Sequence, residues 1–324
     1  MYLNRNVRGM TKQATLTPLR SGDRSRPRRI LVPFDGSSRA ERALNYACAA
    51  FPGDSIVALY VVTRDHDETV SRAWIESPDQ FEEWLDTRRD TAEQAVFADA
   101  RRIADSYDHS ISPALAVGDL NRAIVDYWNT HDIDFLVMDT QGRRLPHVVE
   151  YLTGDVTRRR PRSPTIPAVL VNEETDLLAE TRSETDERRL LVPFDKSARS
   201  TNALEFTCSL FPDAQITVLC MHVVWGDQTF LLDSADTGSE RMEELAATAD
   251  RIAAEYDTTV DTVFGQGALD RAVLQSLEEN AVDLVIAGTL GKAGLESLVL
   301  PSASDRLVRD CPAPVMVVPT PRQR

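Results

Sequence analysis

Lysine is scarce in this sequence of 324 residues, and the acidic side chains are in clear excess. Only Lys12, Lys196 and Lys292 stand among 36 basic residues, and 51 acidic residues bring the net charge to −15. Such a surface repels phosphate backbones, so nucleic-acid binding is not expected. An acidic, lysine-poor chain is typical of a halophile-like, archaeal cytoplasm, while a GC-rich genome would favour arginine equally well.

Long apolar runs and paired metal ligands are missing as well. No stretch approaches the roughly 18 apolar residues of a membrane span, and the first thirty residues lack a signal-peptide core, so we expect a cytoplasmic protein. The four cysteines have no CxxC spacing and the histidines no ligand spacing, which predicts buried thiols without disulfide or metal. No Walker-type GxxxxGK[ST], GxSxG or HExxH motif is present, so we do not expect an enzyme, although slow ATP hydrolysis stays open.

The chain contains a long internal repeat. RRILVPFD at 28–35 returns as RRLLVPFD at 188–195, seven of eight positions being identical. A second block, GDLNRAI at 118–124 and DFLVMDTQGR at 134–143, returns as GALDRAV at 267–273 and DLVIAGTLGK at 283–292. The repeat is too long for a solenoid unit, so each copy should be a complete domain.

Within each copy, short apolar runs alternate with segments of helical periodicity. This alternation predicts an α/β fold: two tandem five-stranded parallel sheets with flanking helices and right-handed crossovers. The predicted strands are 30–34, 56–62, 111–117, 135–138 and 168–171, then 190–194, 216–224, 260–264, 284–287 and 315–318. The predicted helices include 80–107, 120–130, 147–159, 197–210, 238–256, 268–280 and 302–309.

The repeat boundaries divide the chain into four parts. Residues 1–27 are predicted to be a disordered basic tail, and 173–187 an acidic, self-repelling linker. The two domains occupy 28–172 (copy one) and 188–319 (copy two).

Both copies resemble the universal stress protein family, from Arg28 to Pro319. The resemblance rests on VPFD followed by a serine, on VDLVIAGTLGKAGL and on the terminal CPAPVMVVP. It implies the family's adenine-nucleotide alpha hydrolase-like fold. In dimers of the family the last strands pair antiparallel, so the resemblance also implies that strands 168–171 and 315–318 pair within this chain, as an internal pseudo-dimer that protects two sheet edges. It also implies a tandem member with a nucleotide-binding pattern Gly-x2-Gly-x9-Gly-Ser/Thr, which copy two matches except that Pro301 replaces the third glycine.

The resemblance places an adenine-nucleotide site in copy two, at the carboxyl ends of the strands. Glycine lets a backbone approach ribose and phosphate closely, and a serine opening a helix forms an anion site with the free amides. The lysine next to the second glycine supplies a positive charge, and the acidic residue and main chain after the first two strands would contact the adenosine. The predicted site residues are Asp195, Val223, Gly288, Gly291, Lys292 and Ser302. The cofactor would be ATP or another adenine nucleotide, with or without Mg²⁺.

Two departures weaken the expected site. Pro301 lacks an N–H donor, and the loss of one charge-assisted hydrogen bond weakens binding roughly ten- to a hundredfold. In copy one Asp139 replaces the first glycine, and its charge would repel phosphate. Copy one is therefore predicted to be nucleotide-deficient, with a degenerate site at Asp35, Gly142, Arg143 and Gly154. For Asp35 and Asp195, capping of the following helix is an equally good explanation.

Two functional hypotheses follow. The first is a cytoplasmic stress-response regulator that binds adenine nucleotide in copy two and signals its occupancy to a protein partner. The second is a scaffold or interaction protein of the same fold that has lost ligand binding. Assembly into a higher homo-oligomer is compatible with either.

Overall fold

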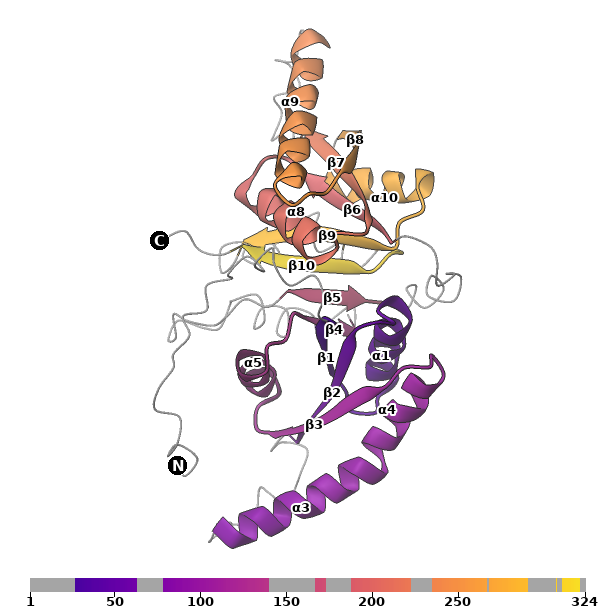
Figure 1. Ribbon diagram of the computed structural model, residues 1–324, viewed down its shortest axis with the longest axis vertical. Helices are drawn as coiled ribbons and strands as arrows, with labels where there is room; N and C mark the ends of the chain where they lie inside the picture. The colour runs from indigo at the N-terminus through magenta and orange to yellow at the C-terminus, as the bar shows by residue number, and fades with distance from the viewer. Residues whose placement is uncertain are drawn as a thin grey trace.

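The computed structural model describes residues 27–62, 78–139, 167–172, 188–222, 235–266, 268–290, 307 and 311–320, and these form two α/β halves around one continuous sheet (Figure 1). Copy one contains β1 (Arg29–Pro33), α1 (Ser38–Ala50), β2 (Ser55–Val62), α3 (Pro78–Gln94), α4 (Val96–Asp105), β3 (Ile111–Val117), α5 (Leu120–Thr130), β4 (Phe135–Asp139) and β5 (Ala168–Val171). Copy two contains β6 (Arg189–Phe194), α8 (Ala198–Leu210), β7 (Gln215–His222), α9 (Ala235–Ala254), β8 (Val260–Gln266), α10 (Leu269–Glu279), β9 (Leu284–Leu290) and β10 (Val315–Thr320). The predicted helices 147–159 and 302–309, the tail and the linker lie almost wholly outside the described residues.

The ten strands follow the order β3-β2-β1-β4-β5-β10-β9-β6-β7-β8. Each half therefore has the same order, read outward from the centre, and all pairings within a half are parallel. This confirms the predicted pair of parallel-sheet domains. The chain crosses from one side of β1 to the other between β3 and β4, and crosses β6 in the same way, which creates a topological switch point in each half.

The inner strands are largely buried on both faces, as their continuous apolar sequences predicted. The outer strands β3 and β8 consist mostly of half-buried and exposed residues. Alternate residues of each strand belong to two separate apolar layers, which extend over both halves of the sheet.

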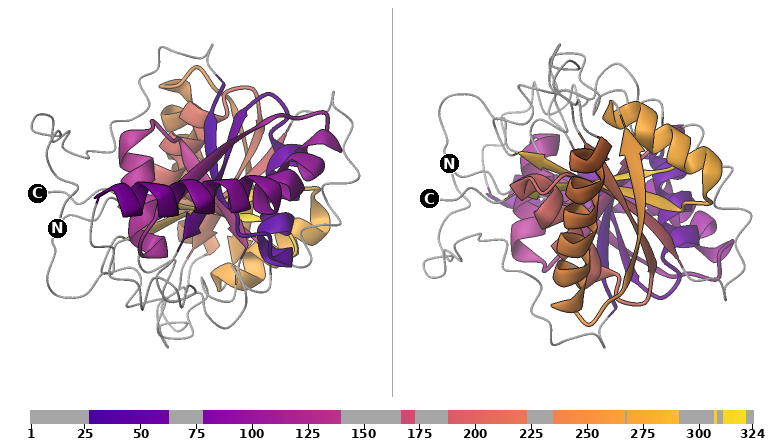
Figure 2. Two further views of the ribbon diagram at one scale, coloured as in Figure 1. Left: turned by 90° about the horizontal axis from the view of Figure 1, so that it is seen from below. Right: turned by 90° about the horizontal axis from the view of Figure 1, so that it is seen from above.

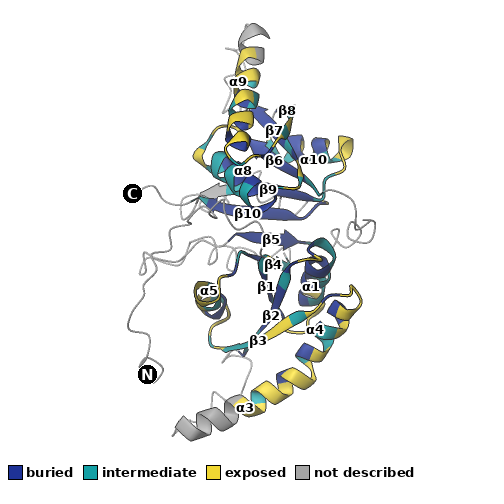
Figure 3. Cartoon of the chain, viewed as in Figure 1, coloured by how far each residue is buried: buried dark blue, intermediate teal, exposed yellow. Residues whose placement is uncertain are grey.

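Helices α1, α4, α8 and α9 cover one layer, while α5 and α10 cover the other. Figure 2 shows the helices of both halves arranged around the central strands, seen from below and from above. The helices are exposed mainly on the sides that face away from the sheet (Figure 3). One sheet with two shared layers makes the copies a single folded body.

The predicted helix 80–107 is two helices in the structure. The break is at Ala95, whose φ of −107° departs from helical geometry. Backbone hydrogen bonds continue on both sides of it: the N–H of Ala95 donates to the carbonyl oxygen of Thr91, and the N–H of Asp99 donates to that of Ala95. α4 buries Phe97, Ala100 and Ile103 against the sheet, whereas α3 extends away from it (Figure 1). Since no proline or glycine lies at the break, the sequence carries no signal for it.

Strands β5 and β10 join the two halves. They pair antiparallel, with Met316 opposite Val169 and Val317 opposite Ala168. This confirms the predicted internal pseudo-dimer. The pairing removes two exposed sheet edges that would otherwise be free to bind other chains.

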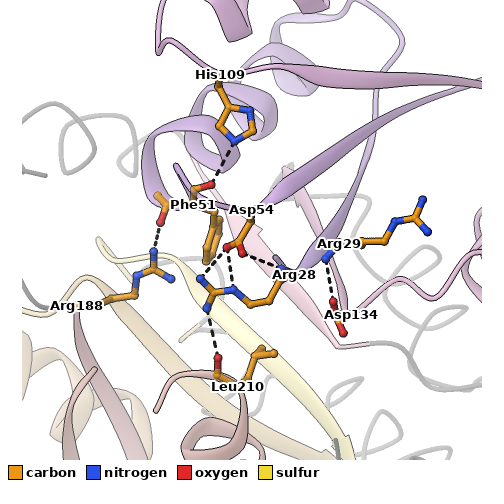
Figure 4. Close-up of polar contacts among 9 residues, drawn as sticks. Arg28, Arg29, Phe51, Asp54, His109, Asp134, Arg188 and Leu210 are labelled. Carbon is orange, nitrogen blue, oxygen red and sulfur yellow. Dashed lines mark hydrogen bonds and ion pairs between the residues drawn. The ribbon is translucent and has the colours of Figure 1, made fainter. Parts of the chain in front are cut away.

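The repeated arginine before each first strand stabilises this junction (Figure 4). Arg28 forms an ion pair with Asp54 in its own half, at 2.7 Å, and donates to the carbonyl oxygen of Leu210 in the other half. Arg188, in copy two, makes the reciprocal contact and donates a hydrogen bond to the carbonyl oxygen of Ala50 in copy one.

Two phenylalanine rings lie beside these arginines. The Arg188 guanidinium carbon is 4.5 Å from the ring centroid of Phe51, and that of Arg28 is 5.1 Å from the centroid of Phe211. Cation–π contacts of this kind add to the hydrogen bonds. Residues that are repeated in the sequence thus hold one copy against the other.

Candidate functional site at the carboxyl ends of the strands

Ligands of open α/β sheets bind beyond the carboxyl ends of the strands, at the switch point. In copy two this position lies between the neighbouring strands β6 and β9. Asp195 directly follows β6, and Gly288 lies near the end of β9. The fold therefore brings two of the predicted site residues, far apart in sequence, to the same edge.

Asp195 is exposed but firmly held. Its Oδ1 accepts a hydrogen bond from the backbone N–H of Ser197 at 3.0 Å and another from the Ser200 hydroxyl at 2.7 Å. Its other oxygen, Oδ2, accepts no hydrogen bond within the described part of the chain. The geometry orients this carboxylate and leaves one oxygen available to an incoming donor.

The same contacts set the protonation state of Asp195. Partial desolvation raises the pKa of the carboxyl group, but the hydrogen bonds from Ser197 and Ser200 and the charge of Arg199 outweigh it. The pKa lies below its ordinary value as a result. Asp195 is therefore an anion at neutral pH and acts as an acceptor only.

The helix caps are serines and not the aspartates. Ser37 and Ser197 are the N-cap residues of α1 and α8, and their hydroxyl oxygens accept from the N–H of Ala40 and Ser200. Asp35 and Asp195 each precede the cap by two residues and accept from the cap's own N–H. The alternative that the aspartates cap these helices is therefore wrong. They form turns before the cap, as aspartate commonly does.

Gly288 was predicted to follow the strand, but it lies within β9, where it pairs with Val318 of β10. The strand is longer than predicted because its pairing with β10 continues to Leu290. Its lack of a side chain has a packing reason. A Cβ at this position would lie 2.5 Å from the carbonyl carbon of Arg199 and even nearer to its oxygen. Glycine here lets the start of α8 approach β9, and any contact with a ligand remains a prediction.

In copy one an ion pair occupies the equivalent place. Asp139, the counterpart of Gly288, ends β4 and pairs through Oδ2 with Nη1 of Arg42 from α1 at 2.5 Å. The Asp139 side chain is only 3% exposed and that of Arg42 only 16%. In copy two the counterpart of Arg42 is Asn202, which donates to the carbonyl oxygen of Pro319.

The remaining predicted site residues cannot be placed. Outside the described residues lie Val223, Gly291, Lys292, Ser302, Gly142, Arg143 and Gly154, as does Pro301. Within the described residues no group of three or more histidine, cysteine, aspartate or glutamate side chains is arranged to hold a metal ion. None of the described helices is long and apolar enough to cross a membrane.

The cysteines are buried without disulfides, as predicted. Burial raises the pKa of Cys48 and Cys208 to about 12 and that of Cys220 to about 11. Thiols in this state are poor nucleophiles at neutral pH.

The two halves of the chain match the same protein family, each as a separate segment. The profile of the universal stress protein family matches residues 27–172 and 187–319, which together make up most of the chain. The chain belongs to this family. The two matched segments correspond to copy one and copy two, so it is a universal stress protein with two family domains.

Individual relatives agree with this assignment. Universal stress protein MJ0531 of Methanocaldococcus jannaschii is 24% identical over 145 residues, which span 42% of this chain and 84% of the relative. A solved universal stress protein of Archaeoglobus fulgidus has 17% identity and a TM-score of 0.63, covering 90% of this chain and 98% of that one. Its similarity extends over both halves and shows the shared fold.

One family protein from Arabidopsis thaliana has been solved with AMP bound. It is 14% identical, has a TM-score of 0.32 and covers 41% of this chain and 92% of its own.

Sequence reasoning missed several residues that matter in this universal stress protein. Arg28 and Arg188 were recognised only as members of the repeat, although their positions before equivalent strands could have suggested a role between the copies. Arg42 gave no signal, because its partner Asp139 is 97 residues away.

Proposed function

We propose that this universal stress protein binds an adenine nucleotide at the carboxyl edge of copy two, and that copy one does not bind one. In this proposal the protein is a stress-response regulator of the cytoplasm, and its nucleotide-bound form is recognised by a protein partner. Its role is binding and not catalysis, because the sequence carries no Walker-type, GxSxG or HExxH motif.

The observation that carries this proposal is the state of Asp195. Its carboxylate stands at the switch point, is ionised, is oriented through Oδ1 and keeps Oδ2 available. A ribose hydroxyl or the amino group of adenine is a donor that such an oxygen can accept from. The predicted partners Gly291, Lys292 and Ser302 follow β9 in sequence and would add the phosphate contacts.

Copy one supports the proposal by contrast. The Arg42–Asp139 pair places a buried carboxylate where copy two has no side chain. An anionic group there disfavours a phosphate-bearing ligand through charge, and Arg42 is already engaged with it. Copy one should therefore contribute structure only.

The second hypothesis, a scaffold that binds no nucleotide, has its own support. Gly288 is explained by its approach to Arg199 without any ligand, and Pro301 removes one expected donor. Nucleotide binding must therefore be measured directly.

The test is calorimetric titration of the full chain with AMP and with ATP, the latter with and without Mg²⁺. We expect saturable binding at one site per chain. Asp195→Ala should weaken it roughly ten- to a hundredfold, the effect of losing a hydrogen bond to a charged group. Ser302→Ala should weaken ATP binding as well.

Asp35→Ala is the matched control, since it removes the equivalent aspartate from copy one. It should leave the affinity unchanged. Absence of heat and of any rise in melting temperature at saturating nucleotide would establish the scaffold hypothesis instead. Equal losses in the two aspartate variants would contradict the assignment of the site to copy two.

A further inference from the structure

The turn that carries Asp195 contains a lysine in an unusual backbone conformation. Lys196 directly follows Asp195 and has a φ of 63°, in the left-handed region that favours glycine. Its counterpart in copy one is Gly36, with a φ of 77°. Among the described residues, the other non-glycine positions with positive φ are all aspartates, namely Asp108, Asp132 and Asp257. Aspartate tolerates this region better than lysine does, so Lys196 is the unusual case.

The side chain of Lys196 reaches a different helix. Its Nζ donates to Oε1 of Glu244 on α9 at 2.7 Å, and this hydrogen bond and the lysine charge lower the pKa of the Glu244 carboxyl group. α9 packs beside α8, and Leu245, next to Glu244, is buried in the apolar layer that both helices cover. Glu244 therefore stands where α9 is held against the sheet. The ion pair ties the turn after β6 to this fixed point.

Copy one lacks both members of the pair. α9 aligns with α4, because buried residues of the two helices match in register: Ala249 with Ala100, and Ile252 with Ile103. The same register places Ala95 opposite Glu244. Copy one thus has glycine and alanine where copy two has lysine and glutamate. The copy for which a nucleotide site is proposed is the one that can form this ion pair.

Stability alone does not account for the lysine. The Lys196 side chain is 36% exposed and that of Glu244 is 68% exposed. Exposed ion pairs contribute little to the free energy of folding, because water and salt screen them. A non-glycine residue in the left-handed region costs at least as much as such a pair contributes. A strained residue directly beside a candidate ligand group points to a role in that site.

We propose that Lys196 is a positioning residue of the nucleotide site, whose ion pair with Glu244 holds the turn in the orientation that presents Oδ2 of Asp195 to the ligand. At the start of α8, Ser197 and Ser200 fix the Asp195 carboxylate through Oδ1. Lys196, between Asp195 and Ser197, fixes the same turn to α9. A turn with fewer conformations loses less entropy on binding, so the pair raises the affinity. This inference rests on the proposed function.

The test is calorimetric titration of the full chain with adenosine and with AMP, which differ by the phosphate. Lys196→Met and Glu244→Gln should each weaken binding of both ligands about two- to fivefold, the range expected for one exposed ion pair. The double variant Lys196→Met/Glu244→Gln should lose no more than either single variant, because the two residues act as a unit.

Salt provides a second readout that a purely structural lysine would not change. At about 1 M KCl the Debye length falls to about 3 Å, and an exposed pair is screened. Raising the salt should therefore weaken adenosine binding by wild type about twofold more than binding by Lys196→Met. Arg251→Met, which breaks the exposed pair of Arg251 with Glu255, is the matched control and should bind like wild type. Urea unfolding checks that every variant is folded.

The outcomes separate this inference from the proposed function. If wild type binds neither adenosine nor AMP, the proposed function fails and the positioning role fails with it. If wild type binds but Lys196→Met or Glu244→Gln binds equally well, only the positioning role is overturned. It is also overturned if Lys196→Met weakens AMP binding alone, since the lysine would then contact the phosphate directly. Additive losses in the double variant would overturn it as well.

Discussion

Copies one and two share their strand order and helix caps, but they differ at the switch point at the carboxyl edge of the sheet. Strand order, serine caps and the preceding aspartates are shared, and yet Arg42 and Asp139 in copy one correspond to Asn202 and Gly288 in copy two. These edge positions are buried too, but each copy fills them differently: copy one with an ion pair, and copy two with a glycine against the start of α8. A duplicated fold can therefore keep its architecture while one copy closes its switch point with an ion pair.

The largest effect on stability is expected from a substitution that breaks the Arg42–Asp139 ion pair. Arg42→Ala removes the ion-pair partner of the buried Asp139 carboxylate, which should lower the free energy of unfolding by about 3–5 kcal/mol. Urea unfolding measures the change, and Asn202→Ala in copy two is the matched control, with an expected cost of about 1 kcal/mol. The Arg42→Ala/Asp139→Ala double variant should be more stable than Arg42→Ala alone. Equal costs for the two single variants would show that the copies do not differ in this way.

The next effect concerns the glycine of copy two. Gly288→Ala places a methyl group against the Arg199 carbonyl and should destabilise the protein by about 2–3 kcal/mol, the cost of overpacking. Gly53→Ala is the control, because nothing lies within 4 Å of a Cβ there. It should change stability by less than about 0.5 kcal/mol. Thermal and urea unfolding of both variants decide between a packing role and a ligand-only role.

A smaller effect is expected at the junction, where the copies act on each other. Arg188→Ala removes the hydrogen bond to Ala50 and the contact with Phe51, at a cost of about 1–2 kcal/mol. Arg251→Ala removes only an exposed pair on α9 and should cost less than about 0.5 kcal/mol. Urea unfolding of both variants measures these costs. If the two losses match, the junction arginines contribute nothing beyond surface charge.

The smallest effect is a pH dependence at Asp195. Because its pKa is lowered by folding, its ionised form stabilises the folded state above about pH 4, and this contribution disappears as the pH falls through the lowered pKa. Asp195→Asn should cost less than about 1 kcal/mol at pH 7, since the residue is exposed, and still less at pH 3. Unfolding at both pH values measures the difference. A cost that grows on acidification would contradict the lowered pKa.

Several features followed from the sequence because they depend on local pattern. Continuous apolar runs identified the strands, and the identities between copies required both halves to share one strand order. The pairing of 168–171 with 315–318 was predicted from the family resemblance and not from local pattern, and its physical reason is that it covers two sheet edges. The break at Ala95 was not predicted, because its residues are all compatible with a helix.

Sequence alone determined that an α/β domain occurs twice, since apolar periodicity and repeated identities are properties of the chain itself. Only the tertiary structure decided what individual residues at the edge and the junction do. Gly288 gained its packing role from Arg199, 89 residues earlier, and Arg188 gained its partners from the other copy. Contacts between distant segments form only once both cores are packed, and no local pattern records them.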